Sequence, residues 1–170
     1  EVDELIFLDI NANQSGKINF SLIDEFADQC FMPLTIGGGI KSLSDIESLL
    51  KIGADKVSIN SSINKEPNLV KEAVKQFGSQ CIIVSIDYKK INNEKKVFIN
   101  SGNTNTNFNL YDYINKIEDF EPGEILLTSI DHDGMMNGFD IETIKSINNK
   151  TKIPIIASGG AGKCEDFVSL

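Results

Sequence analysis

The 170-residue sequence has few of the residues from which metal and redox sites are usually built. It contains a single histidine, His132, which we interpret as a loop residue rather than as a catalyst or ligand. The three cysteines are odd in number, widely spaced and without a CxxC pair, which is typical of reduced thiols in a cytoplasmic protein. We therefore expect no metal ion and no other cofactor.

Two further absences limit the possible partners. With a net charge of −9 and no basic cluster, the chain lacks the charge pattern of a nucleic-acid-binding protein. No apolar run approaches the roughly 20 residues that a membrane-spanning helix needs. The hydrophobic fraction of 41% is enough for an ordinary globular core. The composition therefore predicts a globular protein that binds neither nucleic acid nor a membrane.

The sequence does contain a regular alternation of apolar runs and segments with helical spacing. The apolar runs predict strands at residues 5–10, 33–36, 56–60, 81–87, 124–129 and 154–157. Helical spacing predicts helices at 20–30, 67–77, 109–120 and 140–147, one between Ser42 and Gly53, and the start of a last helix after the second glycine turn. Residues 88–108 are polar and are interpreted as a long loop with a small hairpin near Lys96–Ile99.

Two glycine-rich turns follow apolar strands and precede helices. The first is Gly37–Gly39 after Pro33–Ile36, and the second is Gly159–Gly162 after Pro154–Ala157. Because glycine has no side chain, backbone N–H groups and the positive end of a helix dipole can approach an anion at such a turn. We therefore predict that each turn binds a phosphate group.

The turns belong to a longer internal repeat. Pro33 and Pro154 are 121 residues apart, and the strands that begin near Glu4 and Glu124 are offset by 120 residues. Four strand–helix units separate these markers, as in a half-barrel, and two half-barrels form an eight-stranded (βα)8 TIM barrel. We expect a single α/β barrel domain over 1–170 that runs from strand 2 to helix 7 and is incomplete at both ends. The alternative, a complete six-stranded doubly wound sheet, does not explain the repeat.

Six motifs resemble the cyclase subunit of imidazole glycerol phosphate synthase, the HisF family of (βα)8 barrels. They are VDELIFLDI at 2–10, GGGI at 37–40, GADKVSINS at 53–61, FGSQ at 77–80, GEILLTSID at 123–131 and ASGGAG at 157–162. The resemblance implies an enzyme of histidine biosynthesis. It would use ammonia to form imidazole glycerol phosphate and AICAR from a substrate that carries a phosphate at each end.

The resemblance also implies roles for individual residues in catalysis. Asp87, at the end of the fifth barrel strand, matches the general acid/base carboxylate of the family. The family's second catalytic aspartate would lie on the first strand, which is not among these 170 residues. Asp9 and Thr128 are candidates for orienting the substrate, and a structural role is the alternative for Asp9.

Each glycine turn is expected to bind one phosphate of this substrate. The first site would consist of Gly39, Asn60 and Ser61, and the second of Gly160, Ala161, Asp133 and Gly134. Asp133 is expected to orient the loop or a substrate hydroxyl rather than to touch phosphate. Glycines at turns are otherwise only conformational, and the repeat of the motif is what favours binding.

Three charged residues begin alternate strands. Glu4, Lys56 and Glu124 start the second, fourth and sixth barrel strands, where the resemblance implies a salt-bridged gate for ammonia. A plain charged rim is the alternative. The ammonia would come from a glutaminase (glutamine amidotransferase) subunit in a heterodimer, because the chain shows no nucleophilic cysteine paired with a histidine.

Two loops depart from the family pattern. Residues 131–140 read DHDGMMNGFD where histidine-pathway members carry a run like DRDGTKSGYD, and 101–106 read SGNTNT where a GKKNT pattern is common. A basic residue is thus lost from each of two loops expected to lie over the phosphates. These changes resemble a paralogous branch that passes ammonia toward amidination of a surface-polysaccharide sugar. A third hypothesis is a catalytically inactive barrel that only scaffolds its glutaminase.

Overall fold

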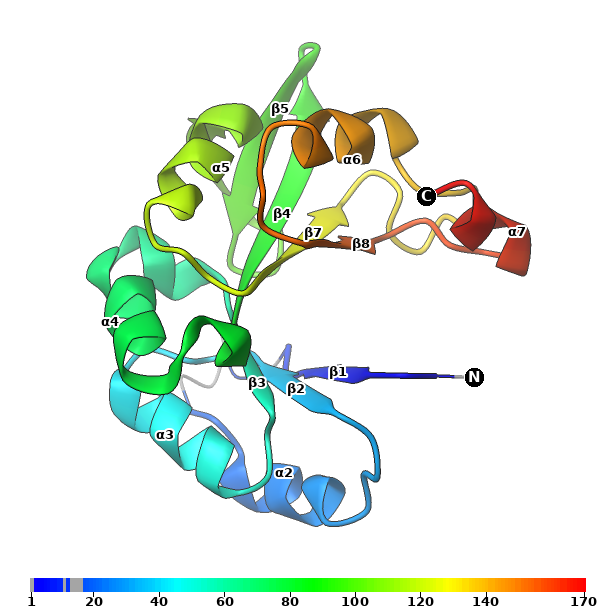
Figure 1. Ribbon diagram of the computed structural model, residues 1–170. Coiled ribbons are helices and arrows are strands. Elements are labelled where there is room, and N and C mark those ends of the chain that lie inside the picture. The colour runs from blue at the N-terminus through cyan, green and yellow to red at the C-terminus, as the bar shows by residue number, and fades with distance from the viewer. Residues whose placement is uncertain (1, 11, 13–16) are drawn as a thin grey trace. The chain divides into compact units, whose positions relative to one another are not determined.

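The computed structural model describes residues 2–10, 12 and 17–170, in which strands and helices alternate along the chain as the sequence predicts (Figure 1). The internal contacts divide the chain between Ile83 and Val84 into two compact units. None of the helices in the described part of the chain is both long and apolar enough to cross a membrane.

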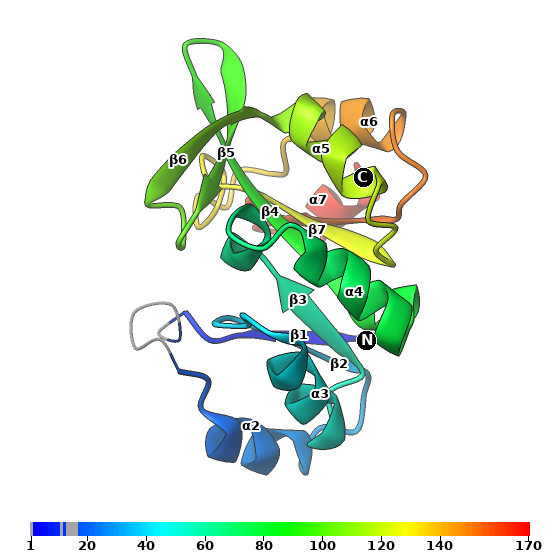
Figure 2. The same cartoon turned by 90° about the vertical axis from the view of Figure 1, so that its left-hand side faces the viewer.

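The first unit is built on three parallel strands, β1 (Leu5–Leu8), β2 (Leu34–Gly37) and β3 (Lys56–Ile59). β2 pairs with both of the others, with Leu34 opposite Leu5 and Thr35 opposite Lys56. Helices α2 (Phe20–Ala27) and α3 (Leu43–Lys51) lie on one face of these strands (Figures 1 and 2). The remaining elements are the 3-10 turn η1 (Ser61–Asn64), helix α4 (Asn68–Phe77) and the 3-10 turn η2 (Ser79–Cys81).

Helix α3 illustrates how the sequence sets this arrangement. Its residues Ile46 and Leu49 lie three apart on one face and have no exposed surface. At its start, Ser42 Oγ accepts a hydrogen bond from the Asp45 N–H at 3.1 Å, and Asp45 Oδ2 accepts one from the Ser42 N–H at 2.9 Å. These two bonds form a capping box, which fixes where the helix begins after the glycine turn.

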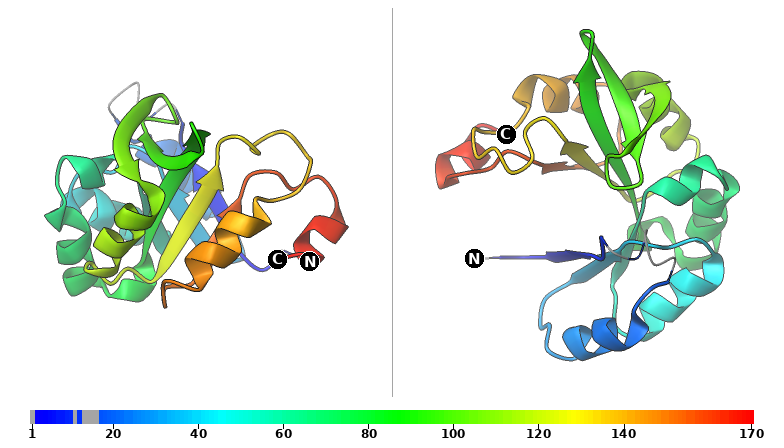
Figure 3. Two further views of the ribbon diagram at one scale, coloured as in Figure 1. Left: turned by 90° about the horizontal axis from the view of Figure 1, so that it is seen from above. Right: turned by 180° about the vertical axis from the view of Figure 1, so that it is seen from behind.

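The second unit contains five strands: β4 (Ile82–Ile91), which begins two residues before the division, β5 (Glu94–Ile99), β6 (Thr104–Asn109), β7 (Glu124–Ser129) and β8 (Ile155–Ser158). β7 pairs with β4 and runs parallel to β8, with Ile125 opposite Ile155. Helices α5 (Leu110–Glu118) and α6 (Ile141–Asn148) lie over one face of this sheet (Figures 1 and 3). The short helix α7 (Cys164–Val168) follows β8.

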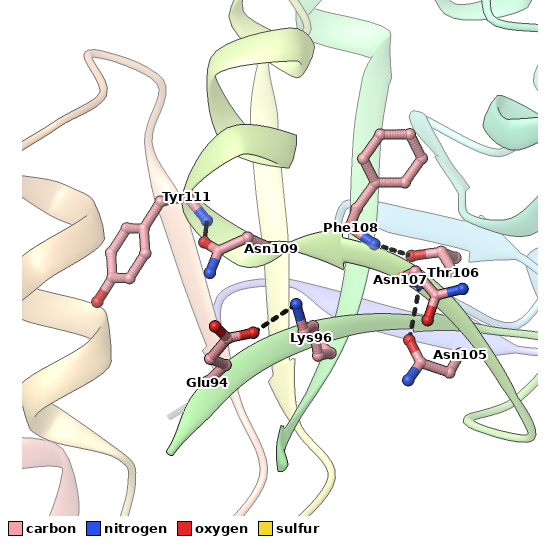
Figure 4. A network of polar contacts seen from close by, with 8 residues as sticks. All are labelled: Glu94, Lys96, Asn105, Thr106, Asn107, Phe108, Asn109 and Tyr111. Atoms are coloured by element: carbon pink, nitrogen blue, oxygen red, sulfur yellow. Dashed lines mark hydrogen bonds and ion pairs between the residues drawn. The ribbon is translucent and has the colours of Figure 1, made fainter. Parts of the chain in front are cut away.

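Residues 88–108 differ from the predicted long loop. β4 continues through Ile91, turns at Asn92–Asn93 with φ values of +48° and +65°, and returns as the antiparallel strand β5. β6 then pairs antiparallel with β5, and the Asn107 N–H donates to Asn105 Oδ1 at 2.8 Å on this strand (Figure 4). The hairpin is confirmed, but the loop assignment is wrong, since strands cover most of these residues. The sequence does not predict these strands because they carry polar residues and lack the apolar alternation of a half-buried strand.

The predicted internal repeat is present in the hydrogen bonds of both units. The Leu5 N–H donates to the Pro33 carbonyl at 3.0 Å in the first unit, and the Ile125 N–H donates to the Pro154 carbonyl at 2.9 Å in the second. Each proline therefore precedes its glycine turn at the same point of the strand ladder. The correspondence of the two strand pairs supports the half-barrel repeat rather than a chance similarity of sequence.

The helices after the two glycine turns also begin alike. Asp45 Oδ2 accepts the N–H groups of Lys41 and Ser42, both at 2.9 Å. Asp166, 121 residues later, accepts those of Gly162 and Lys163 at 2.8 and 3.0 Å. The fold is thus an α/β fold with a mainly parallel sheet, consistent with part of a TIM barrel. Within the described residues, β1 pairs only with β2 and β8 only with β7, so the ladder is not closed.

Candidate functional site

The first glycine turn is a close approach of backbone to backbone at the end of β2. Gly38 has a φ of +104°, and a Cβ atom on it would lie 2.2 Å from the Asp9 carbonyl oxygen. A Cβ atom on Gly39, with a φ of +73°, would lie 2.7 Å from Ala12 Cβ. Only glycine fits both positions, so the backbone of this turn is bare. Among the described residues, no backbone carbonyl accepts a hydrogen bond from the Gly39 N–H.

The turn after β3 lies beside this glycine turn. β2 and β3 are paired with Gly37 opposite Ser58, so the segments that follow them are neighbours. Ser62 Oγ donates a hydrogen bond to the Ile40 carbonyl and joins the two segments. The predicted residues Asn60 and Ser61 stand between these points, with Ser61 Oγ 3.0 Å from Asn60 Oδ1. The structure therefore brings Gly39, Asn60 and Ser61 together.

Asp9 follows β1 and is half-buried. Its backbone N–H donates to the Gly37 carbonyl at 2.9 Å, and its Oδ1 accepts a hydrogen bond from the Ala12 N–H at 3.1 Å. These bonds give Asp9 a structural role at the first glycine turn. A role in orienting substrate stays a prediction beside it.

The second glycine turn packs against the loop between β7 and α6. A Cβ atom on Gly160, with a φ of +109°, would lie 2.2 Å from the Gly138 carbonyl oxygen, and the Gly138 N–H donates to the Gly160 carbonyl at 2.8 Å. A Cβ atom on Gly159 would lie 3.3 Å from the Asp133 nitrogen. The predicted residues of the second site, Gly160, Ala161, Asp133 and Gly134, thus come from two adjacent segments. Asp133 and Gly134 are exposed at the tip of the loop.

Thr128 lies near the carboxyl end of β7. The sequence predicts that Asp87 ends its strand, but the paired strand β4 continues to Ile91, so Asp87 lies in the middle of β4. It is level with the carboxyl end of β7, because the N–H of Ile130, just after β7, donates to the Tyr88 carbonyl at 2.9 Å. The Asp87 and Thr128 side chains are half-buried. Asp87 is opposite Phe98 of β5, and Thr128 is opposite Ser158 of β8. In barrels of this architecture the reacting groups stand at this end of the strands. The position of Asp87 is therefore compatible with proton transfer to a ligand held above β4.

A polar network that the sequence does not predict lies on the other face of β4. Tyr88 is 2% exposed, and its hydroxyl donates to Asp140 Oδ2 at 3.0 Å. Burial raises the pKa of the Tyr88 phenol far above its ordinary value, and the charge of Asp140 acts in the same direction. Burial also raises the pKa of the Asp140 carboxyl, but hydrogen bonds from Thr143 and Tyr88 outweigh this and hold the pKa below its ordinary value of 3.8.

A pocket of about 500 Å³ opens next to this network. It is lined by Tyr88, Lys90, Asn92, Asn93, Asp131, His132 and Asp140. His132 lies on the loop, as predicted, but is half-buried, with its Nδ1 atom 2.8 Å from Ser129 Oγ. In the described part of the chain, no group of three or more His, Cys, Asp or Glu side chains is arranged to hold a metal ion.

Two of the three predicted gate residues form an ion pair. Lys56 Nζ lies 2.5 Å from Glu4 Oε1, and the side chains are 18% and 36% exposed. Glu124, the third, begins β7 in the other unit and is half-buried. The pair is confirmed as a contact, whereas its function as a gate stays a prediction.

Comparison with known proteins agrees with these features. The model of the family described as "Histidine biosynthesis protein" matches residues 1–170. The chain is 50% identical over 166 residues to the imidazole glycerol phosphate synthase subunit HisF of Campylobacter concisus, an alignment that covers 97% of this chain and 66% of that protein. It is 47% identical over 169 residues to the HisF subunit of Natranaerobius thermophilus, covering 99% of this chain and 67% of that protein. The chain thus spans about two thirds of the length of these curated relatives.

Proposed function

The chain belongs to the histidine biosynthesis protein family, and from this premise we propose that it acts as the cyclase subunit of imidazole glycerol phosphate synthase. In this reaction ammonia attacks a keto group of a substrate with a phosphate at each end, the imidazole ring closes, and AICAR is released. The observation that carries the proposal is the pair of glycine turns with matching geometry, 121 residues apart, each next to a second polar turn.

Each turn would hold one phosphate of the substrate. The bare backbone around Gly39 and Gly160 allows N–H groups to approach a phosphate oxygen closely. Asn60 and Ser61 would add side-chain hydrogen bonds at the first site. Asp133 has an acidic side chain, so it would orient the loop or a substrate hydroxyl instead of contacting phosphate.

Asp87 would act as the general acid/base in ring closure. A half-buried carboxylate on β4, level with the carboxyl end of β7, can accept a proton from the attacking nitrogen and return it to a leaving oxygen or nitrogen. A phosphate bound at the Gly160 turn would hold the substrate on the same unit as this carboxylate. Thr128, on the paired strand β7, is a candidate for orienting the substrate.

The ammonia would come from a glutaminase subunit in a heterodimer, because a glutaminase needs a cysteine nucleophile paired with a base and His132 is the only histidine. The Glu4–Lys56 ion pair would flank its entry. Breaking and remaking such a pair can admit a small neutral molecule and exclude water at other times.

The proposed function is tested by turnover of the histidine-pathway substrate with an ammonium salt and the full chain. We expect turnover in the native protein and its loss in Asp87→Asn, because the amide cannot take up a proton at neutral pH. Asp119→Asn, an exposed aspartate just after α5, serves as the matched control and is expected to retain the native rate. Equal activity of the two variants would contradict the role of Asp87.

A second candidate function is favoured by the loop that follows β7. Met135 and Met136 are 62% and 73% exposed, and residues 130–140 contain neither lysine nor arginine. A loop without a cation is poorly suited to a doubly charged phosphate, as expected of the branch that delivers ammonia to a surface-polysaccharide sugar. Absence of turnover together with restored activity of an added glutaminase would favour this branch, or an inactive scaffold.

A further inference from the structure

Residue 88 is bonded to both ends of the loop between β7 and α6, residues 130–140. At the first end, the Ile130 N–H donates to the Tyr88 carbonyl oxygen at 2.9 Å. At the last end, the Tyr88 hydroxyl donates to Asp140 Oδ2 at 3.0 Å. A third bond, from the Lys90 N–H to Asp131 Oδ2 at 2.8 Å, strengthens the attachment of the first end to β4.

Asp140 connects this attachment to helix α6. Its Oδ1 atom accepts the Thr143 N–H at 3.2 Å, and its Oδ2 atom also accepts the Thr143 hydroxyl, so the aspartate is the N-cap of the helix. The Tyr88 hydroxyl thus fixes the residue at which the loop ends and the helix begins. Because the phenol is buried and its pKa is raised, it remains a neutral donor over the physiological pH range.

The same loop supplies the residues of the second anion site. Asp133 and Gly134 lie at its tip, and the Gly138 N–H donates to the Gly160 carbonyl at 2.8 Å. Gly138 is only two residues from Asp140. A displacement at Asp140 would therefore reach the second glycine turn through a very short segment of backbone.

We propose that Tyr88 is a positioning residue for the second anion site, acting through Asp140 on the loop 130–140 and the Gly160 turn. The inference rests on the proposed function, since it assigns to that turn one phosphate of the substrate. Successive side chains of a strand point to opposite faces, so Asp87 and Tyr88 lie on opposite faces of β4. One strand segment would thus hold the acid/base group on one face and anchor the phosphate loop from the other.

The test compares Tyr88→Phe with Tyr111→Phe in the full chain. Both changes remove only a phenolic hydroxyl, but Tyr111 lies on α5, where its ring lies under the Lys150 ammonium at 4.1 Å from the centroid. Loss of a hydrogen bond to a charged group changes an equilibrium constant by roughly tenfold or more. We therefore expect Tyr88→Phe to raise the amide exchange rates of Asp133 and Gly138 about tenfold and to weaken binding of inorganic phosphate several-fold. Tyr111→Phe should change neither.

In the turnover assay, Tyr88→Phe should raise KM for the phosphorylated substrate several-fold while kcat changes little, unlike Asp87→Asn. A double-mutant cycle with Asp140→Asn tests whether the tyrosine acts through that residue, because effects on phosphate binding that run through one bond are not additive. Asparagine retains the N-cap, so the helix start is kept in this variant.

Two results would overturn the inference: exchange and phosphate binding in Tyr88→Phe equal to those in Tyr111→Phe, or full additivity with Asp140→Asn. Failure of the proposed function is a separate outcome. If the native protein does not turn over the histidine-pathway substrate, amide exchange and inorganic phosphate still decide whether Tyr88 positions the loop.

Discussion

Gly160 and Gly134 have similar backbone conformations but different surroundings. Both have a positive φ, +109° and +73°, yet a Cβ atom on Gly160 would meet the Gly138 carbonyl oxygen at 2.2 Å, whereas one on Gly134 would meet no atom within 4 Å. The first glycine is therefore required for the packing of two segments, and the second only for its dihedral angles. This difference can be measured as free energy of unfolding.

Gly134→Ala is expected to destabilise the protein by about 1 kcal/mol, the cost of a left-handed residue with a side chain. Gly160→Ala should cost about 3 kcal/mol or more, because the clash adds an overpacking term. Denaturant unfolding measures both, and phosphate binding should weaken more in Gly160→Ala. Equal losses of stability in the two variants would contradict the close approach of Gly160 to Gly138.

Helix α6 is capped by Asp140, an aspartate whose charge contributes to stability. The folded-state pKa of Asp140 lies below its ordinary value of 3.8, so its carboxylate stabilises the fold above that pH, and this contribution is lost as the pH falls through the folded pKa. Asp140→Asn keeps the cap but loses the charge at the helix N-terminus, which is worth at most about 1 kcal/mol. We expect the variant to be less stable than the native protein at pH 6, and the difference to vanish well below pH 3.8. A difference that persists in strong acid would assign the effect to geometry instead of charge.

The elements with strong local signals could be predicted from the sequence. The strand Glu124–Ser129 has the predicted bounds, and the Ser42–Asp45 capping box marks the start of α3. Helices α5 and α6 begin one residue later than predicted, because Asn109 and Asp140 are N-caps whose side chains accept N–H groups of Tyr111 and Thr143. Caps belong only partly to a helix, so hydrophobic spacing alone does not separate them from its first turn.

The Tyr88–Asp140 bond could not be predicted. Its partners are 52 residues apart, and no local pattern links a tyrosine in a strand to a helix cap that distant. The sequence predicts a loop at Tyr88, because the polar residues Lys89 and Lys90 follow it. Tyr88 is placed next to the loop after β7 only because β4 pairs with both β5 and β7. Sequence periodicity reports local structure, so long-range polar contacts of this kind are identified only from the folded structure.

The repeated turns and the charged strand starts serve different steps in the proposed reaction. The glycine turns would bind the two ends of the substrate, whereas Glu4 and Lys56 begin strands of the first unit at their opposite, amino ends. If the pair controls the entry of ammonia, it should matter only when ammonia arrives from the glutaminase subunit. Ammonium salts supply ammonia directly from solution.

Lys56→Ala is therefore expected to lower glutamine-driven turnover several-fold relative to ammonium-driven turnover in the proposed heterodimer. Its effect on stability should stay below about 1 kcal/mol, because the pair is partly exposed. Lys51→Ala is the matched control. Lys51 pairs with Glu47 at 2.6 Å on the exposed side of α3, so its replacement removes a similar ion pair from the same unit. If the ratio of glutamine-driven to ammonium-driven turnover in both variants equals that of the native protein, the Glu4–Lys56 pair is a charged rim and not a gate.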